Sequence, residues 1–121
     1  MPYEMSNHRR SRGQAVTLKS SGVTTTTGTT TAVEVDGATI RLKFDVTAAS
    51  GTSPTLNVTL QTSSDNGVSD SWRTLGSALT QATGVTSQYV SFGGVDRFVR
   101  ASYTIGGTTP SFTWSLIGEV R

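Results

Sequence analysis

The titratable side chains are the groups that could carry out acid–base chemistry, and they are few. The 121 residues contain one histidine, His8, and eight carboxylates. General acid–base catalysis needs two such groups held together, with pKa values driven apart by their surroundings. His8 lies in an N-terminal stretch without periodicity, and the carboxylates from Glu34 onward fall at outward strand positions or in turns. We therefore expect no catalytic residues and no enzymatic activity, although a carboxylate pair formed only in space leaves no trace in a sequence.

A polar segment, "SDNGVSD" at 64–70, offers the oxygen ligands that calcium prefers. They are Asp65, Asn66 and Asp70, but their spacing is not that of an EF-hand loop. Asp-Asn-Gly is also an ordinary turn signature. We predict a turn, with ion or glycan binding by residues 63–71 left open as the alternative. The chain has no cysteine, so thiolate zinc sites are excluded, and we expect no metal and no cofactor.

The charge is unevenly distributed along the chain. Arg9, Arg10 and Arg12 make residues 1–13 basic, whereas residues 14–121 hold equal numbers of basic and acidic side chains. A neutral body is unlike a nucleic-acid-binding domain, which carries a basic stripe. We predict that 1–13 is a flexible arm whose arginines pair with carboxylates of a partner, and that nucleic acid is not that partner. An arm reaching DNA inside a capsid is the alternative.

Period-two alternation runs through the rest of the chain. In "GATIRLKFDV", the apolar Ile40, Leu42 and Phe44 alternate with polar side chains, as in a strand with one buried face. Strands are expected at 16–18, on either side of Gly28 within the threonine-rich segment 21–35, and at 38–48, 55–62, 72–76, 85–92, 96–105 and 111–121. Gly28 is expected at a turn or bulge, Asp36-Gly37 at a hairpin turn, and "ASGTSP" at 49–54 is expected to end a strand.

This pattern predicts an all-β fold made of eight or nine strands. We predict an antiparallel two-sheet β-sandwich of jelly-roll type, forming a single domain over 14–121. An immunoglobulin-like sandwich is the alternative topology. No internal repeat is evident. No apolar run reaches the length of a membrane span and no signal peptide is evident, so we expect no membrane partner.

Most aromatic side chains lie on the apolar side of their strands and are expected in the core. Phe98 is the exception, because in "RFVRASYTI" it shares a face with Arg100. An outward aromatic residue flanked by arginines is typical of a contact surface. We predict a partner-contact patch of Arg97, Phe98 and Arg100. Trp72, Tyr89 and the segment 63–71 are the alternative candidates for a carbohydrate platform.

Two stretches resemble a known class of proteins. They are "LNVTLQTSSDNGVSDSWRTLG" and "YVSFGGVDRFVRASYTIGGTTPSFTWSLIGEV". Within residues 55–121, the chain resembles small virion proteins of tailed bacteriophages, most of all the jelly-roll capsid decoration (cement) proteins. The shared features are a strand ending in Gln-Thr-Ser, a polar loop, a tryptophan before Leu-Gly, a Phe-Val-Arg strand, a Gly-Gly-Thr turn and an aromatic closing strand.

The resemblance implies a structural, non-enzymatic protein. Such a protein binds the outer surface of an assembled phage head, where its partner is the major capsid protein. The resemblance further implies a homotrimer that is made in the host cytoplasm and located on the virion. A tail tube, connector or fibre protein, or a carbohydrate-binding or adhesin module, are the alternatives.

Overall fold

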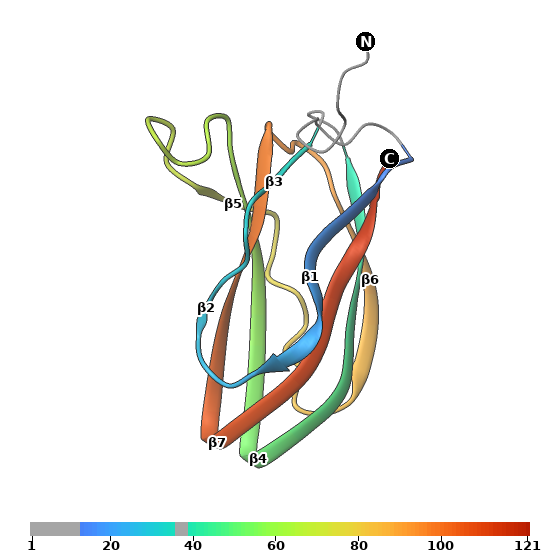
Figure 1. Ribbon diagram of the computed structural model, residues 1–121, viewed down its shortest axis with the longest axis vertical. Helices are drawn as coiled ribbons and strands as arrows, with labels where there is room; N and C mark the ends of the chain where they lie inside the picture. The colour runs from blue at the N-terminus through green and yellow to red at the C-terminus, as the bar shows by residue number, and fades with distance from the viewer. Residues whose placement is uncertain (1–12, 36–38) are drawn as a thin grey trace.

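The computed structural model describes residues 13–35 and 39–121 (Figure 1). These residues form seven strands and no helix. The strands are β1 (Ala15–Thr24), β2 (Gly28–Thr29), β3 (Val33–Glu34), β4 (Ile40–Ser63), β5 (Arg73–Leu75), β6 (Thr86–Phe92) and β7 (Phe98–Val120). The expected arm, with Arg9, Arg10 and Arg12, and the expected turn at Asp36-Gly37 lie outside the described residues, apart from Gly13.

Strands β4 and β7 form one long antiparallel ribbon that is folded in half. Their pairing runs from Ile40 opposite Val120 to Ser63 opposite Phe98, with register shifts between Val46 and Thr55. Both strands bend sharply at the same end of the molecule, the lower end in Figure 1. The two halves of the ribbon therefore face each other.

Shorter strands extend each half of the ribbon into a layer. In the first layer, β1 pairs with 112–119 of β7, and β6 pairs with 40–46 of β4. In the second layer, β2 and β3 pair with 98–103 of β7, and β5 pairs with 60–62 of β4. The all-β, antiparallel fold predicted from the sequence is confirmed. Hydrogen bonds join both layers into one continuous sheet through β4 and β7, and the jelly-roll topology stays a prediction.

The corner of the ribbon corrects one expectation from the sequence. "ASGTSP" was expected to end a strand, but β4 continues through it. Residues 51–54 (GTSP) and 107–110 (GTTP) occupy equivalent places in the two strands, and their glycines have φ of 112° and 107°. Positive-φ glycines let each chain turn while the strands stay paired on both sides.

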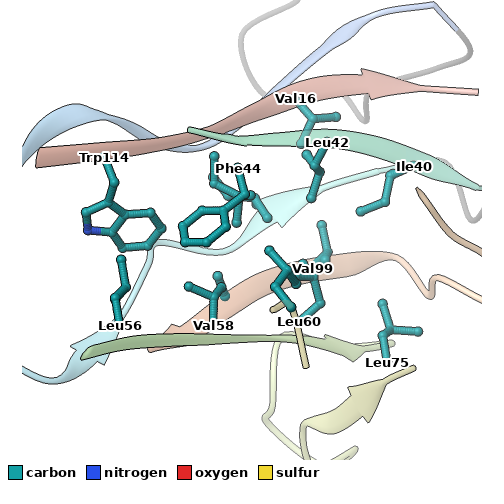
Figure 2. Packing of buried hydrophobic residues seen from close by; sticks show 14 of the residues in the cluster. Val16, Ile40, Leu42, Phe44, Leu56, Val58, Leu60, Leu75, Val99 and Trp114 are labelled. Carbon is teal, nitrogen blue, oxygen red and sulfur yellow. The ribbon is translucent and has the colours of Figure 1, made fainter. Parts of the chain in front are cut away.

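The core lies between the two layers (Figure 2). Phe44 and Trp114 project from the first layer towards Leu56 and Val58 of the second, and all four are fully buried. Trp114 makes edge-to-face contacts with Phe44 at 5.7 Å and with Tyr103 at 5.3 Å between ring centroids. These residues are on the inward faces expected from the alternation, so the polar residues between them face outward in both layers.

Two local expectations differ from the structure. Gly28 lies within β2 rather than at a turn, opposite Tyr103 of β7. A Cβ atom there would lie 3.1 Å from the Tyr103 hydroxyl oxygen, so the small residue leaves room for that side chain. Trp72 was expected inside a strand but precedes β5, which begins at Arg73.

Candidate functional site: a cation–aromatic patch on the second layer

The outer face of the second layer presents two aromatic side chains, each covered by an arginine. The Arg97 guanidinium carbon lies 5.4 Å from the centre of the Phe98 ring, and that of Arg100 lies 4.3 Å from the centre of the Trp72 ring. Val99 is fully buried between Phe98 and Arg100, so strand alternation turns the latter two outward. We call Trp72, Arg97, Phe98 and Arg100 the contact patch.

Both arginines of the contact patch are also held by polar neighbours. The Arg97 Nε donates to Glu34 Oε2 on β3, in an ion pair. The Arg100 Nε donates to Gln61 Oε1 at 2.8 Å, and Gln61 is its cross-strand neighbour on β4. A guanidinium held at its edge and stacked through its face has few remaining conformations. Contacts within the chain thus hold both arginines of the patch in place.

A buried threonine fixes the backbone beneath the patch. Thr62 has no exposed surface. Its hydroxyl donates to the Phe98 carbonyl oxygen at 2.8 Å and accepts from the Asp96 amide at 2.8 Å. Arg73 then donates to the Gly94 carbonyl oxygen at 2.9 Å and to the Asp96 carboxylate at 3.2 Å. The turn leading into β7 is therefore tied to both β4 and β5.

The segment 63–71 forms a closed loop around one carboxylate. Asp65 accepts hydrogen bonds from the backbone amides of Val68, Ser69 and Asp70, at distances from 2.8 to 3.2 Å. These amides, that of Asp70 first, lower the pKa of Asp65 below its usual value. The carboxylate oxygens thus accept hydrogen bonds from the backbone of their own loop, as an aspartate does in a turn of the predicted kind.

Ser63 supports the same loop from beneath. It is fully buried, donates to the Asp70 carbonyl oxygen at 2.6 Å and accepts from the Gly67 amide at 2.8 Å. Gly67, with φ of 79°, lies directly against the Trp72 indole and leaves no room for a Cβ atom. The loop therefore determines where Trp72 lies.

The predicted site residues are partly brought together. Arg97, Phe98 and Arg100 lie side by side, as expected, whereas Arg9, Arg10 and Arg12 lie outside the described residues. Trp72 was missed as a member of this patch. No local sequence signal places it there, because its position depends on a long-range pairing: Thr74, two residues further on, pairs with Gln61 on β4, the neighbour of Arg100.

The alternative carbohydrate platform is not a single surface. Trp72 belongs to the outer face of the second layer, whereas Tyr89 lies in β6 of the first layer, opposite Lys43. The core separates these two outer faces, so the two rings do not form one binding site.

Over 13–35 and 39–121, no three histidine or acidic side chains are grouped as metal ligands. None of the described segments forms an apolar helix long enough to cross a membrane.

Comparisons with known proteins give little further information. No protein-family model matches the chain, and no curated protein matches it. A similar solved structure is that of the CBM22-1 and GH10 modules of endo-1,4-β-D-xylanase 10B from Clostridium thermocellum, in complex with xylohexaose. The identity is 10%, the TM-score is 0.46, and the match covers 74% of this chain and 19% of the xylanase chain. This chain therefore spans about a fifth of that protein, and a TM-score this low carries no weight for its fold or function.

Proposed function

We propose that this chain is a structural virion protein that binds the outer surface of an assembled bacteriophage capsid and stabilises it. The observation that carries the proposal is the contact patch, a pair of arginine–aromatic stacks on the outer face of the sheet, in which Arg97 is exposed and Trp72, Phe98 and Arg100 are half-buried. Trp and Arg are among the residues that contribute most to binding at protein interfaces. Because the patch is already ordered, little conformational entropy is lost when a partner covers it.

The strand arrangement is compatible with this role. With β4 and β7 each divided at the corner, and β2 and β3 taken together, the chain has eight strand positions. These positions are numbered 1 to 8 along the chain, separately from the β labels. The order in the first layer is 1-8-3-6, which is β1, the second half of β7, the first half of β4 and β6. The order in the second layer is 2-7-4-5, which is β2 with β3, the first half of β7, the second half of β4 and β5. We read this order as a jelly roll, in which a long folded ribbon gives the stiff support that a capsid-stapling protein needs.

The capsid partner is inferred from the chemistry of the patch and of the N-terminal residues. Guanidinium groups pair bidentately with carboxylates, so Arg9, Arg10 and Arg12 suit acidic side chains on a shell of major capsid protein. We propose a homotrimer on the virion surface, following the resemblance described above. A tail or fibre role would use the same patch with a different partner.

Cosedimentation with assembled heads of the encoding phage tests the proposal. We expect saturable binding at a fixed copy number per capsomer. Phe98→Ala combined with Arg100→Ala should weaken binding at least about tenfold, because it removes a ring and a cation from the patch. Arg9, Arg10 and Arg12 changed together to Ala should weaken it further.

Arg41→Ala is the matched control, since it removes an exposed arginine from the opposite layer and should leave capsid binding unchanged. Absence of binding by the unaltered protein would overturn the decoration role. A loss of binding by orders of magnitude between about 50 and 200 mM salt would instead indicate phosphate contacts, as for DNA.

A further inference from the structure

The outer face of the first layer carries a second group of aromatic and cationic side chains. Tyr89 on β6 is 63% exposed. The Arg41 guanidinium carbon lies 5.0 Å from the centre of its ring, and the Lys43 ammonium nitrogen lies 5.8 Å from it. Arg41 and Lys43 are both on β4, next to β6. One exposed ring therefore has two cations beside it.

These side chains border an open depression of about 400 Å³ in the sheet surface. Ile117 of β7, itself 39% exposed, forms part of its lining together with Tyr89, Arg41 and Lys43. Pockets for small ligands begin at about 300 Å³. The depression thus has room for one or two sugar rings, and it offers apolar as well as cationic surface.

The charges around the depression favour an anion. Within the described residues, neither Arg41 nor Lys43 forms an ion pair. Glu119, which lies opposite Arg41 on β7 and also lines the depression, is paired with Arg121 at 2.5 Å. Among the described residues, Asp45 is the other acidic group on this face, two residues along β4 from Lys43 and opposite Ser87 and Ser115. Two cations are thus left without a carboxylate partner beside an exposed ring.

We propose that this depression binds a carboxylated sugar, such as a uronic-acid or sialic-acid residue of an acidic glycan. A pyranose ring presents a face of C–H groups that packs on an aromatic ring, and Tyr89 with Ile117 supplies that surface. A carboxylate on the sugar accepts charge-assisted hydrogen bonds from the Arg41 fork and from Lys43. The site lies on the layer opposite the contact patch, so it does not depend on the capsid proposal.

Binding is tested on the full chain with four acidic probes, by isothermal titration calorimetry. The probes are trigalacturonate, a hyaluronan tetrasaccharide, an alginate trisaccharide and sialyllactose. At least one should bind, and its neutral methyl ester should bind at least about tenfold more weakly, because the carboxylate is then no longer charged. Raising the salt concentration should lower the affinity for the acidic probe and leave the affinity for the ester unchanged.

Two variants separate the contributions of ring and charge. Tyr89→Ala should reduce affinity for both the acid and its ester. Arg41→Gln combined with Lys43→Gln should reduce affinity for the acid alone, by about tenfold or more. All three positions are on the solvent-facing side of their strands, and the unfolding midpoint of each variant reports whether the fold is intact. Arg73→Gln, which removes an exposed cation from the second layer, is the matched control and should bind as the unaltered protein does.

Three results would overturn the proposal. The first is no binding of any acidic probe at 10 mM, on the order of the weakest useful affinities. The second is binding that the Tyr89 and Arg41–Lys43 variants leave unchanged. The third is equal binding of hexaglutamate with the same dependence on both variants, which would make the site a receptor for acidic peptides.

Discussion

Gly51 and Gly107 each lie against the backbone of the other's corner. A Cβ atom on Gly51 would lie 2.7 Å from the Thr109 carbonyl oxygen, and one on Gly107 would lie 2.7 Å from the Ser53 carbonyl oxygen. The relationship is reciprocal because β4 and β7 bend at the same point with the same four-residue pattern. This double corner folds the ribbon in half, so that the outer faces of the two layers point in opposite directions.

Alanine at either corner glycine should destabilise the protein. Gly51→Ala and Gly107→Ala would each place a side chain at φ above 100° and against backbone atoms that have no room to move. We expect each to lower the free energy of unfolding by about 2 kcal/mol or more. Gly84→Ala is the control, because nothing lies within 4 Å of its Cβ position. Chemical denaturation measures all three, and an effect at Gly51 no larger than at Gly84 would contradict the account of the corner.

Thr62→Val should loosen the support beneath the contact patch. The change keeps the shape of the side chain but leaves the Asp96 amide and the Phe98 carbonyl without the Thr62 hydroxyl. We expect a loss of about 1 to 3 kcal/mol in unfolding free energy. Amide hydrogen exchange should also speed up at Asp96. Thr74→Val, at an exposed position on β5, is the control. An equal loss of unfolding free energy in both variants would show that Thr62 does not support the patch.

The hydrogen bond between the Trp114 indole and a hydroxyl at the edge of the core should contribute to the stability of the fold. The Trp114 Nε1 donates to Thr24 Oγ1 on β1 at 3.1 Å. Thr24→Val should cost about 1 to 2 kcal/mol, since a largely buried N–H loses its acceptor. The exposed Thr26→Val should cost little. Urea denaturation followed by tryptophan fluorescence measures the stability of both variants. If Thr24→Val leaves the free energy of unfolding unchanged, water replaces the hydroxyl as the acceptor.

The loop 63–71 should make stability depend on pH. Backbone amides lower the pKa of Asp65 in the folded protein. The ionised carboxylate therefore stabilises the fold at pH above its unfolded pKa of about 4, and this stabilisation is lost as the pH falls through the lower, folded pKa. Asp65→Asn should thus reduce stability at pH 6 and have a smaller effect at pH 2.5.

Denaturation midpoints at these two pH values test the loop directly. Asp45→Asn is the matched control, because no hydrogen bond to the Asp45 carboxylate is present in the described part of the chain. A carboxyl titration that puts the pKa of Asp65 at or above its ordinary value would contradict the assigned hydrogen bonds.

The strand pattern made most of the core predictable. Phe44, Leu56 and Val58 lie inside and Arg41 lies outside because period-two alternation depends only on the local chain. The corner was not predictable in this way. Gly-Thr-Ser-Pro reads as a strand end in isolation, and it becomes a bend in a continuing ribbon only because 107–110 crosses it at the same place.

The contact patch was predictable for the residues that share one strand. Phe98 and Arg100 lie two positions apart on β7, so their common face follows from the sequence. Trp72 was assigned elsewhere, because its position depends on the closed loop around Asp65 and on the pairing of β5 with β4. Long-range pairing of this kind leaves no local signal, and the separation of Trp72 from Tyr89 was hidden for the same reason.

The most direct measurement is cosedimentation of the purified chain with assembled heads of the phage proposed to encode it, beside the Phe98→Ala/Arg100→Ala variant and the Arg41→Ala control. We predict saturable binding at a fixed copy number per capsomer, strongly weakened in the patch variant and unchanged in the control. Failure of the unaltered chain to bind, or equal binding by all three proteins, would contradict the assignment of the contact patch to a capsid partner.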